Sequence, residues 1–160
     1  MRTLVLGIGN PLMSDDGVGL HVLEALSGQQ PALDDVDYLD AGTLSLLLLP
    51  RFEHCDALLV LDAAQLGAPP GALRVLHDAD MDAFFRNARG SVHEVGIRDL
   101  LDAARLTGTL PSRRAFVGVQ PQRVSIGSTL SPSLQASIAA AAAQARAILE
   151  RWQAPPRRLA

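Results

Sequence analysis

The chain has no lysine, one cysteine and one tryptophan, and it lacks long apolar runs. A single cysteine, Cys55, excludes an internal disulfide and a zinc site built from several cysteines. No apolar stretch approaches the ~20 residues that a bilayer span requires, so we expect no membrane segment. The net charge is −3, which gives no indication of a basic, nucleic-acid-binding surface. The chain opens directly into a strand-like segment without a charged leader, and we therefore expect a cytoplasmic protein.

Short apolar runs alternate with helical patterns along the 160 residues. This alternation predicts an α/β protein, a three-layer α/β/α sandwich around a mostly parallel, twisted sheet of about five strands. We expect one domain over residues 1–153 and a flexible C-terminal tail over 154–160. The predicted strands are 2–8, 36–39, 57–62, 72–76 and 115–119. The predicted helices are 16–27, 44–52, 93–107 and 132–152, with a weaker one near 80–87. Two helix starts carry capping signals, Ser91 with Glu94 and Ser131 before Pro132.

A glycine-rich turn, residues 7–19, follows the first predicted strand without either common nucleotide-binding signature. The G-x-G-x-x-G fingerprint would require glycine where Leu12 stands, and the phosphate-binding P-loop requires a lysine. The turn instead ends in Asp15 and Asp16, two carboxylates that would repel a phosphate and attract a cation. The sequence thus indicates a carboxylate presented at the mouth of an α/β sheet.

Three residues of metal-binding type fall at the carboxyl ends of predicted strands or at helix starts, where ligands of open parallel sheets bind. Asp16 follows the first strand, Asp62 ends an apolar strand, and His93 lies in the first turn of a helix. The partial positive charge of a helix N-terminus favours the unprotonated, ligating forms of Asp16 and His93. Two carboxylates and an imidazole suit nickel, zinc, iron or manganese. We therefore predict one metal site at Asp16, Asp62 and His93.

Each of these residues also has a purely structural interpretation. Asp15 and Asp16 are plausible helix caps, an aspartate that ends a strand is often a turn former, and one histidine in a first helical turn is usually structural. His77 lies in an acidic segment that reads as a solvated loop. Cys55 follows His54, but adjacent residues of a helix do not face one another, so we expect a buried structural cysteine. No serine lies in a G-x-S-x-G motif.

Six short segments occur in a fixed order, spread over residues 4–134. They are Gly7-x-Gly9-Asn10 with Asp15-Asp16-Gly17-x-Gly19, then Asp40-Ala41-Gly42-Thr43, Leu61-Asp62-Ala63, Ser91-x-His93-x-x-Gly96, Gly118-Val119-Gln120-Pro121 and Leu130-Ser131-Pro132. This ordered set resembles the motifs of the nickel-iron hydrogenase maturation endopeptidases.

The resemblance implies an endopeptidase that removes a C-terminal extension from the hydrogenase large-subunit precursor after nickel insertion. The family's metal-contacting residues fall on Asp16, Asp62 and His93, and Asp40 matches a further acidic position, which makes it the best candidate for a general base. The resemblance also implies that nickel arrives with the substrate, with no organic cofactor, and we expect a monomer. Hydrolysis would use either a metal-polarised carbonyl or an activated water. This sequence departs from the family in two places: many members carry Glu at the position of Asp16, and Ala41 replaces a usual glycine.

Two other functions remain compatible with the sequence. One is a metallopeptidase or amidase with its own resident zinc or manganese. The other is a non-catalytic nickel-binding chaperone, which would bind the precursor without shortening it. A nucleotide-binding module is disfavoured by the missing fingerprint and by the carboxylate pair.

Overall fold

The computed structural model describes residues 1–43, 46–87 and 92–154, and over these residues strands and helices alternate as the sequence predicts. The five strands found there are β1 (Thr3–Ile8), β2 (Val36–Gly42), β3 (Ala57–Ala63), β4 (Leu73–His77) and β5 (Arg113–Val119). The α-helices found there are α1 (Val18–Ser27), α2 (Asp78–Asn87), α3 (Val92–Thr107) and α4 (Pro132–Gln153). Two 3-10 helices, η1 (Ser14–Gly17) and η2 (Leu46–His54), complete the described elements.

The strands form one sheet in the order β2-β1-β3-β5-β4. Neighbouring strands from β2 to β5 are parallel, and β4 pairs antiparallel with β5. The central strands β1 and β3 are buried along their whole length, as their continuous apolar runs indicate. The edge strand β2 is only half-buried. This arrangement confirms the predicted mostly parallel α/β fold.

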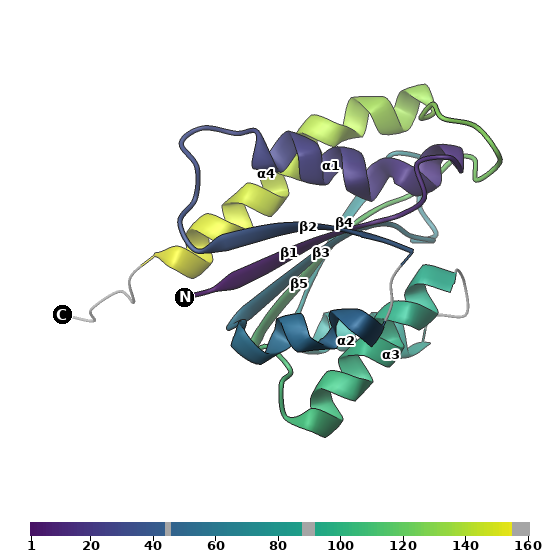
Figure 1. The fold of residues 1–160 in the computed structure, drawn as a ribbon. Coiled ribbons are helices and arrows are strands. Elements are labelled where there is room, and N and C mark those ends of the chain that lie inside the picture. The colour runs from purple at the N-terminus through teal and green to yellow at the C-terminus, as the bar shows by residue number, and fades with distance from the viewer. Residues whose placement is uncertain (44–45, 88–91, 155–160) are drawn as a thin grey trace.

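Helices cover both faces of the sheet and create two apolar cores (Figure 1). On one face, α1 and α4 pack over the sheet. Alanines at Ala141, Ala142 and Ala145 bring α4 close to the strands. On the other face, α2, α3 and η2 enclose three phenylalanines and the apolar side of α3. The buried residues of α3 include those that its periodicity predicts, Ile97, Leu100, Leu101 and Ala104. None of the helices in the described ranges is long and apolar enough to cross a bilayer.

The predicted elements differ from the observed ones mainly at their ends. The predicted helix 44–52 is the 3-10 helix η2, which contains Pro50; a proline inside an α-helix removes a backbone hydrogen bond. Residues 44–45, where that prediction began, lie outside the described residues. The same holds for Ser91, the predicted cap of α3, and for 155–160 of the predicted tail.

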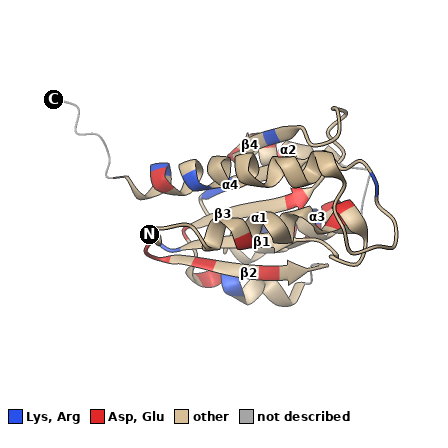
Figure 2. Ribbon diagram, turned by 90° about the horizontal axis from the view of Figure 1, so that it is seen from above, with Lys and Arg blue, Asp and Glu red and all other residues tan. Residues whose placement is uncertain are grey.

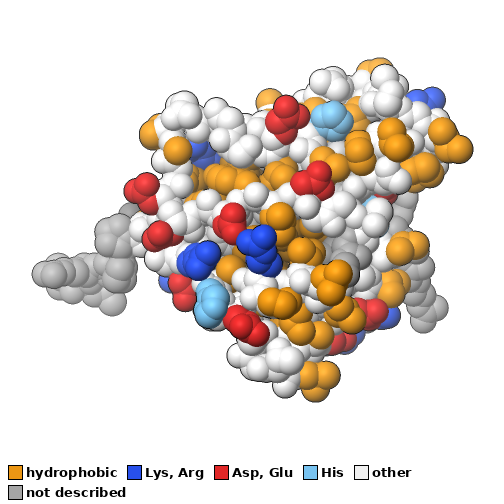
Figure 3. Space-filling view, viewed as in Figure 1, with side chains coloured by type: hydrophobic (Ala, Val, Ile, Leu, Met, Phe, Trp, Pro, Cys, Tyr) orange, Lys and Arg blue, Asp and Glu red, His pale blue; other side chains and the backbone are white. Residues whose placement is uncertain are grey.

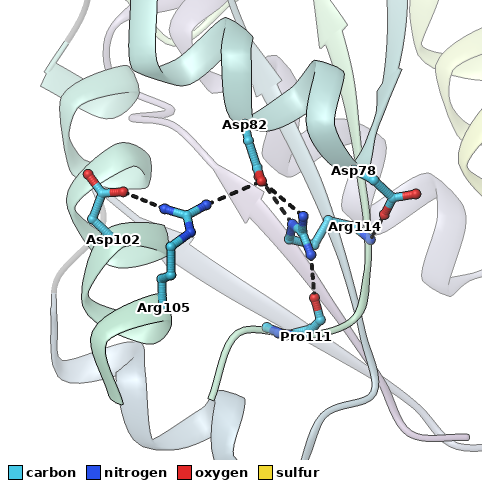
Figure 4. Close-up of polar contacts among 6 residues, drawn as sticks. All are labelled: Asp78, Asp82, Asp102, Arg105, Pro111 and Arg114. Atoms are coloured by element: carbon cyan, nitrogen blue, oxygen red, sulfur yellow. Dashed lines mark hydrogen bonds and ion pairs between the residues drawn. The ribbon is translucent and has the colours of Figure 1, made fainter. Parts of the chain in front are cut away.

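The acidic segment after β4 is exposed at its start but is helical rather than a loop, in agreement with the weaker helix predicted near 80–87. It forms α2, and Asp82 accepts two hydrogen bonds from the guanidinium of Arg114, at 3.1 and 2.9 Å (Figure 4). Arg105 of α3 reaches the same carboxylate at 3.2 Å and also pairs with Asp102. Asp78 accepts a hydrogen bond from the backbone N–H of Arg114. These contacts join α2, α3 and the amino end of β5, at the end of the sheet opposite Asp62.

A glycine allows α1 to approach the sheet closely. A Cβ at Gly19 would meet the carbonyl oxygens of Ile8 and Leu61 and lie 3.0 Å from Cα of Asp62. Ile8 is the last residue of β1, and Leu61 and Asp62 lie near the end of β3. Any larger residue at this position would push the start of α1 away from the strand ends.

Candidate active site

Asp16, Asp62 and His93 meet at the carboxyl end of the sheet. They come from η1, from the end of β3 and from the first turn of α3. Nε2 of His93 lies 3.5 Å from Oδ2 of Asp16, and Nδ1 lies 3.5 Å from Oδ1 of Asp62. Figure 2 shows acidic residues at the arrowhead of β3 and along β2. The sequence prediction that these three side chains gather at one rim is therefore met in the fold.

Asp62 is an unusual carboxylate because its side chain is 1% exposed and neither oxygen has a hydrogen-bond partner of good geometry. Burial raises the pKa of Asp62 to about 7, although His93 acts in the opposite direction. The contact with Asp62 raises the pKa of His93, against the effect of its own burial. Both shifts favour the protonated form, so the Asp62–His93 pair keeps its protons to a higher pH than an isolated aspartate and an isolated histidine would.

The imidazole stands between the two carboxylates and presents one nitrogen to each. For this reason the three side chains do not converge on one point, and no group of three or more His, Cys, Asp or Glu side chains in the described parts of the chain makes a ready metal cage. The donor set nevertheless fits a divalent cation, because unpartnered buried carboxylate oxygens and Nδ1 of His93 are the groups that a cation would satisfy.

The glycine-rich turn fixes Asp16 on the rim. Oδ2 of Asp16 accepts the backbone N–H of Asn10 at 3.0 Å, so this carboxylate does not cap α1. A Cβ at Gly9, where φ is +141°, would collide with the carbonyl of Asp16. Ser14 adopts φ of 53°, a left-handed conformation, and its N–H donates to the carbonyl of Gly127 at 2.8 Å. The turn is thus held by contacts that a mobile loop would lack.

Asp15 has a structural role that the sequence analysis missed. Its fully buried carboxylate accepts hydrogen bonds from the backbone N–H groups of Gln122, Arg123 and Ser131 and from the hydroxyl of Ser131. Burial alone would raise the pKa of Asp15, but these hydrogen bonds outweigh it and lower the pKa. Asp15 thereby anchors the segment between β5 and α4 to the turn that carries Asp16.

Asp40 lies at the same end of the sheet but outside this group. It is exposed near the end of β2, and Oδ1 accepts the N–H of Gly42 at 2.8 Å. Together with Tyr38 and residues of α1, among them His21, it lines a groove of about 430 Å³. The contacts found among the described residues do not join Asp40 to His93.

A cavity of about 280 Å³ opens beside Asp16, lined also by Gln65, Glu94 and Val124. Its wall after β3 is held by Gln120, whose Oε1 accepts the N–H of Leu66 at 2.7 Å and whose Nε2 donates to Gln65. The Gln120-Pro121 pair was noticeable in the sequence only through the family resemblance. Through this cavity Asp16 is reachable from solvent.

The fold is a three-layer α/β protein, and its candidate functional site is this acid–histidine cluster at the carboxyl end of the sheet. Residues 20–148 match the family HycI, described as hydrogenase maturation protease. The hydrogenase 2 maturation protease of Escherichia coli K12 is 37% identical over 150 residues, covering 93% of this chain and 91% of that relative. The hydrogenase expression/formation protein HupD of Rhodobacter capsulatus is 38% identical over 152 residues, covering 94% of this chain and 72% of that relative.

Structural similarity agrees with these matches. The solved hydrogenase maturating endopeptidase HybD of E. coli superposes with a TM-score of 0.89 at 35% identity, covering 96% of this chain and 94% of that one. The chain therefore belongs to the hydrogenase maturation proteases and is a peptidase.

Proposed function

We propose that this peptidase removes a C-terminal extension from the large-subunit precursor of a nickel-iron hydrogenase, and that it recognises nickel already held by that precursor. The observation that carries the proposal is the pair of unpartnered carboxylate oxygens on Asp62, next to an unpartnered Nδ1 of His93. Leaving such groups buried costs stability unless a ligand satisfies them. A divalent cation brought by the substrate is such a ligand.

The chain's own residues would then bind and orient the substrate. Asp16 lines the cavity beside the rim, so it is accessible to an incoming ion, whereas Asp62 is buried on the other side of His93. A cation binding to these carboxylates displaces the proton of the Asp62–His93 pair. The scissile peptide, docked through the metal, is then hydrolysed through a polarised carbonyl or an activated water. Asp40, on β2 and separated from β3 by β1, is our candidate for the base.

The test compares precursor loaded with nickel, precursor loaded with zinc and metal-free precursor, each mixed with metal-free enzyme. The precursor mass is then measured by mass spectrometry. We expect a loss of mass only with nickel. His93→Ala should abolish cleavage, while the exposed His77→Ala, a matched control, should retain it.

Three results would contradict the proposal. Cleavage of metal-free precursor by metal-free enzyme would exclude nickel recognition. Dependence on zinc bound to the enzyme would identify a metallopeptidase with a resident metal. Binding of nickel-loaded precursor with no change in its mass would identify a chaperone.

A further inference from the structure

An exposed apolar ledge adjoins the candidate active site. It consists of Leu12, from the glycine-rich turn, and of Val124 and Ile126, from the segment between β5 and α4. Their exposures are 67%, 50% and 92%. The two chain segments lie side by side, since the N–H of Gly127 donates to the carbonyl of Leu12 at 3.0 Å. Hydrophobic side chains gather at the edge of the molecule where the green loop of Figure 1 runs (Figure 3).

The ledge is rigidly built even though its apolar side chains face solvent. Met13 and Gly127 form a parallel bridge, and the hydroxyl of Ser14 donates to the carbonyl of Ser125 at 2.9 Å. Asp15 holds both ends of the same segment through Gln122, Arg123 and Ser131. Burial of Val124 and Ile126 does not account for this order, because both remain exposed. A surface ordered before binding loses less conformational entropy when a partner covers it.

The ledge is continuous with the site, because Val124 lines the cavity that contains Asp16. A substrate segment that fills this cavity would contact Val124 as well as Asp16. Exposed apolar side chains that gather in one patch, rather than standing singly, are typical of protein-binding surfaces.

We propose that Leu12, Val124 and Ile126 dock the folded part of the protein substrate, through an apolar surface beside the segment to be cut. This inference rests on the proposed function, since it takes the large-subunit precursor as the occupant. The metal contact would recognise the precursor's state of maturation, while the ledge would recognise the surrounding protein surface. The aliphatic side chains of the ledge have no group that could take part in the hydrolysis, so its contribution belongs to binding.

The test uses full-length enzyme and nickel-loaded precursor, with kcat and KM measured for Leu12→Ser and Ile126→Ser. Burying one such side chain is worth enough to raise KM about tenfold when it is lost, with kcat unchanged. The control is Leu106→Ser, because Leu106 is 90% exposed at the far end of α3 and should leave both constants unchanged.

An unchanged KM in both ledge variants would overturn the inference while leaving the proposed function intact. If neither the wild-type protein nor Leu106→Ser cuts the precursor, the proposed function itself fails. Sedimentation of the wild-type protein provides the remaining check. A dimer at assay concentration that Ile126→Ser dissociates would show that a second copy of this chain covers the ledge, which also overturns the inference.

Discussion

Replacing Asp62 by asparagine should stabilise the protein while destroying its activity. The side chain is buried, and its oxygens lack good hydrogen-bond partners, so ionisation is costly in the folded state. One pKa unit corresponds to ~1.4 kcal/mol, so a folded-state pKa of about 7 against the usual 3.8 sets an upper bound of ~4 kcal/mol on that cost. We set ~1–2 kcal/mol against it for the buried, poorly paired amide of asparagine. The expected net gain is then ~2–3 kcal/mol above pH 7.

The pH dependence gives this prediction its sign. Between pH 3.8 and about 7 the unfolded chain has lost the proton of Asp62, while the folded protein still holds it. The free energy of unfolding of the wild type therefore falls as pH rises through this window, and the gap to Asp62→Asn widens. The raised pKa of His93 acts in the same direction, because the folded protein keeps the imidazole proton to a higher pH than the unfolded chain does, so this stabilisation is also lost as pH rises.

Urea unfolding in the presence of chelator, at several values across this pH range, measures the gap. The exposed Asp80→Asn is a matched control and should track the wild type at every pH. If Asp62→Asn is no more stable than the wild type above pH 7, ionised Asp62 is not the unfavourable buried charge described above.

Three further predictions concern Asp15, Asp82 and Cys55. Asp15→Asn should lower the free energy of unfolding in urea by ~2–4 kcal/mol at neutral pH, because four donors lose a charged acceptor. Since the pKa of Asp15 is lowered, this loss of stability should shrink as pH falls below 3.8, and a pH-independent loss would contradict the prediction. Asp82→Ala should lower the free energy of unfolding by ~2–3 kcal/mol, because Arg114 loses its carboxylate partner, yet the variant should still process the precursor below its melting temperature. Loss of processing by the folded variant would instead link that end of the sheet to the candidate site. Cys55→Ser should retain processing. Burial raises the pKa of the Cys55 thiol, which disfavours the nucleophilic thiolate, and its Sγ donates to the carbonyl of Arg51. Inactivation of the variant without unfolding would instead support a cysteine nucleophile.

Local patterns were sufficient to predict the elements of the fold. Continuous apolar runs such as residues 57–61 have few alternatives to a buried strand, and the parallel order follows from their alternation with helices. The 3-10 character of η2 was not predictable from apolar spacing, because Pro50 and packing against α3 determine it.

The candidate site was predictable where position along a strand or helix determines it, as for Asp16, Asp62 and His93. The role of Asp15 was not, because its hydrogen-bond partners lie 107 to 116 residues further along the chain. No local pattern distinguishes a carboxylate that faces a distant loop from one that faces the rim. In the same way, the imidazole's position between two carboxylates depends on how three elements pack.

The close approach at Gly19 also bears on how such a site can be retuned. Because the start of α1 is pressed against the ends of β1 and β3, the backbone that carries Asp16 has little freedom to shift relative to Asp62. The position of the carboxylate at residue 16 can then be changed mainly through the length of its side chain. Replacing Asp16 by glutamate would extend the carboxylate by ~1.5 Å into the neighbouring cavity while the scaffold stays in place. Adding or removing one methylene at this position would therefore move the carboxylate with no change of fold.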